Sequence, residues 1–449
     1  MIGALLERFR LVHANHRRIA AGAFWIGLFV LAAKLCVAAR EMAIAWRYGI
    51  GAEVDAYQIA LTVTTWLPMM LFGLAAVVLV PRLVALRRAG GDPGFTDEMN
   101  GTVLLVGLAL ASLTWAAAPL AVELLTGSLA PRTRSLAESL TRDLAPVAFL
   151  IVVGGYLSAR LQAREHYAYS FADAAPALVI ALFVITGAGG APTAPLLYGT
   201  LLGYVLYALW LVRMTARADP PLGRLRLRHR SDQWPLVYGP FITMGLGQLF
   251  VTAALPVDQA FAAGLGEGAV STLGYVNRIT TLITSFGSVV FARALLPVLS
   301  GAVAEGDQEL GRSQALKWAW LMAGLAAVGA AVAWLLAPLV VRILFERGAF
   351  DAGDTALVSE VLRYGLLQLP PFFGGIVLVQ YYAAANRYRA ILGITLLALV
   401  AKVAANALLV RSMGVSGIMV STAIMYCVTT LLMAAASRGG PARPRKGSF

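Results

Sequence analysis

The chain has 449 residues, of which 59% are hydrophobic and only 13% are charged, and its mean hydropathy is +0.76. So little charge cannot cover the surface of a soluble protein of this length, so a soluble domain is excluded and an integral membrane protein is indicated. The net charge of +13 requires no nucleic acid partner, because topological bias of Lys and Arg and attraction to anionic lipids explain it.

Apolar segments predict an all-α polytopic membrane protein with about twelve transmembrane helices. They lie at about 20–40, 56–80, 101–122, 144–160, 169–187, 192–212, 236–257, 270–298, 315–340, 359–383, 389–410 and 415–436. The first is expected to remain uncleaved, because Lys34 interrupts the region in which a signal peptide stays uncharged. Lys and Arg are concentrated in alternate segments that include both tails, so the positive-inside rule predicts cytoplasmic termini.

Two parts of the sequence resemble each other at a nearly constant spacing. "TWAAAPLAVELL" at 114–125 matches "AWLLAPLVVRIL" at 333–344, and "YGIGAEVDAY" at 48–57 resembles "AGLGEGAVST" at 263–272. The repeat predicts two pseudo-symmetric six-helix lobes around a central cavity. An even number of spans in each lobe makes the repeat parallel, with its axis along the membrane normal.

The predicted lobes are 1–213 and 235–436, with a basic cytoplasmic linker at 214–234 and a basic cytoplasmic tail at 437–449. Within the linker, "RLRLRHR" at 224–230 alternates Arg with Leu or His. We interpret it as an orienting cytoplasmic loop. Binding of phosphate or of a lipid surface is the alternative.

Two cations lie inside predicted spans. Lys34 lies about six residues from the outer end of its span, a depth of roughly 9 Å at ~1.5 Å per residue. Arg278 lies about eight residues into its own span, a depth of roughly 12 Å from the same face by the same rise. A cation near the bilayer centre costs ~2.5–3.5 kcal/mol, so we expect both to face a shared water-filled cavity for an anionic substrate. Alternatively, Lys34 and Glu41 share a helix face, neutralise each other and only pack the lobe.

Other charged residues in or near the spans have two interpretations each. Lys402 is either a cavity or a packing residue, and Arg363 can extend outward to the interface. Asp55 and Asp258 lie at span ends, where capping or solvation competes with ion coupling.

The sequence predicts no enzyme, no metal site and no cofactor. Its two cysteines, Cys36 and Cys427, lie in apolar segments without metal or redox spacing. The four histidines form no metal-binding motif. No nucleophile–base pair is present, and "GIGAEV" lacks the strand-then-helix context of a dinucleotide site.

Three motifs together resemble the MurJ/MviN family of lipid II flippases. They are "KLCVAAREMAIAWRYGIGAEVDAYQIA" at 34–60, "STLGYVNRITTLITSFGSVVFARALLPVLS" at 271–300 and "LFERGAFDAGDT" at 344–355. The resemblance implies the fold of the multidrug/oligosaccharidyl-lipid/polysaccharide exporter superfamily. It also implies alternating-access translocation of an undecaprenyl-diphosphate-linked saccharide, such as lipid II for peptidoglycan, across the bacterial cytoplasmic (inner) membrane.

The family's substrate-binding positions can be carried over to this chain. Lys34, Arg40 and Arg278 match its cavity cations, and Glu41 and Asp55 match its acidic positions. The implied partners are a polyprenyl-diphosphate-linked sugar and membrane lipids, with cell-envelope assembly proteins as further candidates.

The chain departs from the family pattern at three points. Pro68 occupies the position of a cavity arginine, Asn277 replaces the acid before the arginine of the eighth helix, and about twelve spans replace the usual fourteen. A flippase for an exopolysaccharide repeat unit therefore remains an alternative. Further alternatives are a cation-coupled multidrug antiporter of the same fold and a non-transporting scaffold.

Overall fold

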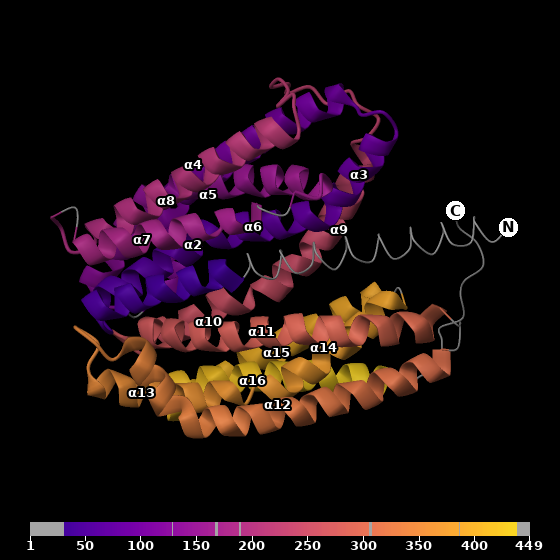
Figure 1. Ribbon diagram of the computed structural model, residues 1–449. Helices are drawn as coiled ribbons and strands as arrows, with labels where there is room; N and C mark the ends of the chain where they lie inside the picture. The colour runs from indigo at the N-terminus through magenta and orange to yellow at the C-terminus, as the bar shows by residue number, and fades with distance from the viewer. Residues whose placement is uncertain are drawn as a thin grey trace. The chain divides into compact units, whose positions relative to one another are not determined.

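The computed structural model describes residues 31–437 except 128, 167–168, 188–189, 305–307 and 386. The side chains of 286, 289–304, 308 and 310 also lie outside this description. The predicted first span is therefore covered only from residue 31, and the predicted tail only at Ser437. The regular structure of the described residues is helical, so the predicted fold class is confirmed (Figure 1).

A helix over residues 31–48 comes first, followed by sixteen further elements in the labelling of Figure 1. They are α2 (Ala52–Leu74), the π-helix η1 (Ala75–Leu79), α3 (Val80–Arg88), α4 (Pro93–Thr126), α5 (Pro131–Ala163), α6 (Tyr169–Ala172), α7 (Ala174–Thr186), α8 (Ala194–Ala218), α9 (Pro235–Thr252), α10 (Ala254–Ala263), α11 (Ala269–Ala304), α12 (Gln308–Phe345), α13 (Ala352–Leu366), α14 (Leu369–Ala384), α15 (Tyr388–Met413) and α16 (Val415–Ala436). Within the described residues, 10 helical segments are long and apolar enough to cross a membrane.

Local sequence explains several of the helix boundaries. Proline is the first residue of α4, α5 and α9, where its missing N–H removes no helical hydrogen bond. Asp351 caps α13 in a reciprocal capping box with Asp354. Gly187, in the left-handed conformation at φ 68°, ends α7.

The described chain divides into two compact units. Unit 1 contains residues 31–47, 56–123 and 132–246, and unit 2 contains 48–55, 124–131 and 247–437. The division falls inside α9. Helix α8 continues to Ala218, so the connecting segment is shorter than the predicted linker.

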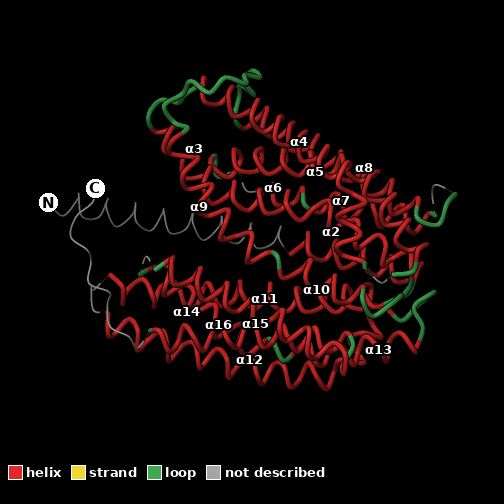
Figure 2. The backbone as a smooth tube through the Cα atoms, turned by 180° about the vertical axis from the view of Figure 1, so that it is seen from behind, coloured by secondary structure: helices red, strands yellow, loops and turns green. Residues whose placement is uncertain are grey.

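Helix α5 is the most buried membrane-spanning helix of unit 1. In its apolar window 78% of the residues are buried, compared with 11% for α4. A Cβ on Gly154 would lie 2.4 Å from the Tyr207 ring of α8, and one on Gly155 would lie 3.0 Å from Cα of Phe72 in α2. Two adjacent glycines therefore let α5 approach both neighbours closely, and Figure 2 shows these helices running alongside one another.

In unit 2, α14 packs against both α12 and α16. Tyr382 of α14 donates a hydrogen bond to the Met433 carbonyl of α16 at 2.8 Å. The Thr430 hydroxyl donates to the Pro371 carbonyl at 2.7 Å. A Cβ on Gly374 would lie 3.2 Å from the Ala319 carbonyl oxygen of α12. Small residues and backbone-directed hydrogen bonds thus join these apolar helices, as is typical of membrane bundles.

One of the two sequence matches falls on comparable elements of the two units, whereas residues 48–55 and 263–272 of the other both lie in unit 2. Pro119 and Pro338 both lie inside long helices, α4 and α12. Trp115 and Trp334, four residues earlier in each helix, are 59% and 45% exposed. The matched motifs therefore occupy the same kind of position, a tryptophan on the outer face of a long apolar helix.

Candidate functional site

The helix over residues 31–48 carries three of the predicted site residues, all in unit 1. The Arg40 Nε donates a hydrogen bond to the Glu41 carboxylate at 3.1 Å. The Arg40 side chain is 13% exposed and the Glu41 side chain 5%. Tyr57 of α2 and Tyr204 of α8 lie within electrostatic range of Arg40. The guanidinium is thus held in a largely buried, polar-lined environment between three helices.

Lys34 lies on the same helix, half-buried, and attracts the carboxylate of Asp173. Asp173 is exposed at the start of α7, and its side chain makes no capping hydrogen bond to that helix. In the described contacts, Glu41 pairs with Arg40 while Lys34 faces Asp173. Asp173 is not among the predicted site residues, although an acid within an apolar segment was a usable signal.

The position of Lys34 along its helix differs from the sequence estimate, because the helix continues to residue 48 rather than ending near 40. Lys34 is therefore about 14 residues, or roughly 21 Å, from that end at ~1.5 Å per residue. Arg40 is about 8 residues from it, roughly 12 Å by the same rise. Arg278 is about 9 residues from the start of α11, roughly 14 Å. Arg40 therefore matches Arg278 in depth along its own helix more closely than Lys34 does.

Asp55 lies in unit 2 and is fully buried. Its two carboxylate oxygens accept hydrogen bonds from the backbone N–H groups of Gly268 and Ser271, both at 2.6 Å. Gly268 directly precedes α11 and Ser271 lies in its first turn, where a negative charge is favourable. Asp55 thus fixes the start of the helix that carries Arg278.

The three motifs that carry the family resemblance meet around this contact. Tyr275 of α11 donates a hydrogen bond to the Gly49 carbonyl at 2.8 Å. Gly49 has φ +59°, and a Cβ there would lie 2.5 Å from the Ala349 carbonyl oxygen. Both the left-handed backbone and the close approach require glycine. The turn sequences of these motifs therefore form a packed junction within unit 2.

Arg278 itself lies on α11 in unit 2, half-buried and in contact with neighbouring groups. The five predicted site residues thus form two sets. Lys34, Arg40 and Glu41 belong to unit 1, and Asp55 and Arg278 belong to unit 2. No group of three or more metal-ligand side chains occurs among the described residues.

A buried ion pair occupies the interior of unit 2. The Lys402 ammonium of α15 lies 2.9 Å from the Asp258 carboxylate of α10, and it donates a hydrogen bond to the Thr422 hydroxyl of α16 at 2.5 Å. Asn406 donates to the same carboxylate at 3.2 Å. Lys402 is 0% and Asp258 6% exposed. This contact favours the packing interpretation of Lys402, because its charge is neutralised where three helices meet.

Arg363 has a different environment. Its guanidinium lies 4.9 Å from the centre of the Trp334 ring, and its Nε donates to the Trp334 carbonyl at 3.3 Å. A cation stacked on an exposed tryptophan suits an interfacial anchor.

Comparison with known proteins assigns the family. The family model described as lipid II flippase MurJ matches residues 44–441. A probable lipid II flippase MurJ of Rhizobium tropici is 26% identical over 77% of this chain and 67% of its own length. The lipid II flippase MurJ of Burkholderia cenocepacia is 25% identical over 90% of this chain and 81% of its own length.

Solved structures share the fold. A lipid II flippase MurJ in an inward closed conformation superposes with a TM-score of 0.78 at 16% identity, covering 92% of this chain and 87% of the other. An inward-facing multidrug resistance transporter of the MATE family superposes with a TM-score of 0.74 at 17% identity. This match covers 92% of this chain and 97% of the other. Both share the two-lobe fold. The family model spans most of the sequence, and the chain therefore belongs to the MurJ family of lipid II flippases.

Proposed function

We propose that the chain translocates an undecaprenyl-diphosphate-linked saccharide, lipid II or a similar cell-envelope precursor, across the bacterial cytoplasmic membrane. The family match over 44–441 carries the proposal. The charged helix over residues 31–48 agrees with it, because lysine and arginine inside a membrane bundle suit an anionic headgroup. The chain acts with both termini in the cytoplasm, in keeping with the distribution of Lys and Arg.

The proposed mechanism is alternating access around a cationic cavity. The diphosphate binds Lys34, Arg40 and Arg278 while the polyprenyl tail remains in lipid. Binding of the anion offsets repulsion among the cations and favours an occluded state. Membrane potential assists the return of the empty cationic cavity. Moving one full charge across the membrane changes the free energy by ~2.3 kcal/mol per 100 mV.

Glu41 and Asp55 have supporting roles in this mechanism. Glu41 holds the Arg40 guanidinium by a side-chain hydrogen bond. Asp55 has both carboxylate oxygens occupied by backbone N–H groups of α11, so it positions Arg278 through the helix. Neither acid needs to touch the diphosphate.

Flipping of fluorescent or native lipid II in vesicles tests the proposal. Lys34→Ala and Arg278→Ala should each abolish flipping while membrane insertion persists. Arg411→Ala, which removes an exposed arginine at the end of α15, should leave flipping unchanged. Normal flipping by both cavity variants would reject the proposed site. A non-transporting scaffold would show no flipping even in the wild type. Both alanine variants would then leave its function unchanged.

The nature of the saccharide is a separate arm of the same experiment. Vesicles carrying an undecaprenyl-diphosphate exopolysaccharide unit are compared with vesicles carrying lipid II. The departures at Pro68 and Asn277 favour making this comparison, because both lie where the family pattern has charge. Preference for the exopolysaccharide unit would replace lipid II as the substrate while retaining the mechanism.

A cation-coupled multidrug antiporter is the second candidate. Its support is the exposed Asp173 carboxylate of unit 1, together with the fold shared with MATE transporters. It predicts that vesicles load a cationic dye when a sodium or proton gradient is imposed, and that Asp173→Asn prevents loading. The flippase proposal predicts no dye uptake.

A further inference from the structure

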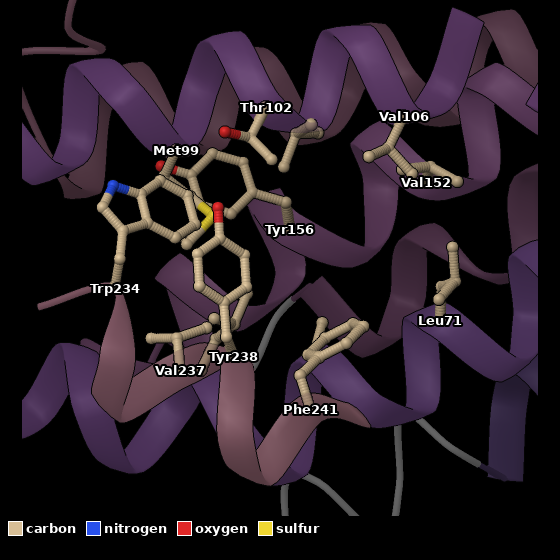
Figure 3. A pocket seen from close by; sticks show the side chains of 13 residues that line it. Leu71, Met99, Thr102, Val106, Val152, Tyr156, Trp234, Val237, Tyr238 and Phe241 are labelled. Carbon is tan, nitrogen blue, oxygen red and sulfur yellow. The ribbon is translucent and has the colours of Figure 1, made fainter. Parts of the chain in front are cut away.

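Unit 1 contains an apolar pocket that the flippase proposal does not use. It encloses about 260 Å³ between α2, η1, α4, α5 and α9. Figure 3 shows the Trp234 and Tyr238 rings close together at one end and Val106, Val152 and Leu71 toward the other. The lining is almost entirely hydrocarbon, so the pocket suits an alkyl chain rather than a polar solute.

An aromatic cluster forms the end of the pocket next to the linker. The Trp234 ring stacks on Tyr238 with centroids 5.0 Å apart and lies 4.1 Å from the His229 ring. His229 is hydrogen-bonded to the hydroxyl groups of Thr102 and Tyr238 at 2.8 Å and 2.7 Å. Tryptophan and tyrosine gather at the headgroup level of a bilayer. The pocket therefore runs from an interfacial end into the hydrocarbon-facing part of the helices.

The basic linker is fixed at this end by the acidic residues of α4. Asp97 accepts a hydrogen bond from the Arg224 backbone N–H at 2.6 Å. Glu98 accepts from the backbone N–H groups of Arg230 and Ser231 and from the Trp234 indole. A Cβ on Gly101 would lie 2.1 Å from the Arg226 carbonyl oxygen, so the linker backbone rests directly on α4.

The side chains of the fixed linker remain exposed. Leu225 and Leu227 are 64% and 65% exposed, and the side chains of Arg228 and Arg230 on either side of His229 are also exposed. Cations and apolar side chains therefore stand together at the interfacial end of an apolar pocket. This combination matches a ligand with an anionic head and a hydrocarbon chain.

We propose that this pocket binds an anionic phospholipid of the cytoplasmic leaflet, with an acyl chain between α4, α5 and α9 and the phosphate at Arg228 and Arg230. The site is separate from Lys34, Arg40 and Arg278, so it does not depend on the proposed flippase activity. The lipid would fasten the linker, and through it the start of α9, to the membrane surface.

Quenching of Trp234 fluorescence by brominated acyl chains tests the site. The full chain is placed in lipid nanodiscs in which brominated phosphatidylglycerol or brominated phosphatidylcholine replaces part of the lipid. The Trp234 signal is the difference between the protein and its Trp234→Phe variant. Phosphatidylglycerol should half-quench it at a much lower mole fraction than phosphatidylcholine.

Two pairs of variants separate headgroup from chain. Arg228→Gln with Arg230→Gln should raise the half-quenching fraction of phosphatidylglycerol roughly 10- to 30-fold. Arg213→Gln with Arg217→Gln, exposed arginines of α8, should not change it. Val106→Phe, which fills the pocket, should reduce quenching by both lipids, unlike Leu105→Phe on the exposed face of α4.

Equal quenching by the two lipids would overturn the proposal, because it indicates ordinary surrounding lipid. So would a preference for phosphatidylglycerol that survives the loss of Arg228 and Arg230. The arginine variants decide the outcome even if Val106→Phe fails to fold. Flipping should persist in all these variants, so failure here is distinguishable from failure of the flippase proposal.

Discussion

Buried charges in this chain are explained by their partners rather than by depth alone. Lys402, Asp258 and Asn406 form one hydrogen-bonded group inside unit 2, and Arg40 is held by Glu41 inside unit 1. Hydropathy shows that each charge lies in an apolar segment, but not which partner neutralises it. Asp258 and Lys402 are 144 positions apart in sequence, so no local pattern could have paired them.

Lys402→Ala should destabilise the protein strongly. Removing one partner of a buried ion pair leaves the other charge unpaired, which costs about 3–5 kcal/mol in free energy of unfolding. Thermal unfolding in detergent should show a clearly lowered midpoint for Lys402→Ala. Arg411→Ala, on the same helix, should leave the midpoint unchanged. Lys402→Met combined with Asp258→Leu should recover most of the loss. A stable Lys402→Ala protein that no longer flips lipid would instead assign Lys402 to the substrate.

Asp55→Ala should also lower stability, because two backbone N–H groups of α11 lose their acceptor. Loss of a helix cap costs about 0.5–2 kcal/mol. Asp55→Asn keeps one acceptor oxygen, so its stability should lie between that of the alanine variant and that of the wild type. The measurement is again the unfolding midpoint, with Glu53→Ala as the neighbouring control. An unchanged midpoint together with lost flipping would indicate direct contact with substrate.

The helices occur in the order of the predicted spans, but the helix ends do not coincide with the predicted span ends. Hydropathy marks where side chains become polar, whereas a helix ends where its backbone hydrogen bonds end. The helix over residues 31–48 continues past Arg40 and Glu41, whose side chains pair with each other. The linker was predictable as basic, yet its fixed backbone was not, because Asp97 and Glu98 lie more than a hundred positions earlier.

Gly101→Ala should release the linker from α4. Its new methyl group would meet the Arg226 carbonyl oxygen, while a Cβ on Gly73 of α2 has no atom within 4 Å. Limited trypsin digestion of inside-out vesicles should therefore cut at the linker arginines several-fold faster in Gly101→Ala than in Gly73→Ala. Equal cutting rates would show that the linker is not held by this contact.

At the scale of the whole molecule, the predicted repeat is supported by Trp115, Pro119, Trp334 and Pro338, which occupy matching positions in α4 and α12. The sequence also indicated the family and the cationic character of the spans. It could not reveal that Asp55 serves α11, because the hydrogen bond to Ser271 spans 216 positions. Asp173 did carry a sequence signal, as an acid within an apolar segment, but its neighbour Lys34 is known only from the folded unit.

The most direct measurement is protection of single cysteines by substrate. Ala38→Cys and Thr281→Cys, each one helical turn from Lys34 or Arg278 so that both cations stay in place, are made separately after Cys36 and Cys427 are replaced by serine, and each is treated with a water-soluble thiol reagent. Both should be labelled, and an undecaprenyl-diphosphate-linked saccharide should slow both reactions, but not that of Arg411→Cys. If either cavity cysteine is inaccessible, or reacts at an unchanged rate with substrate present, cations from the two units do not share one diphosphate.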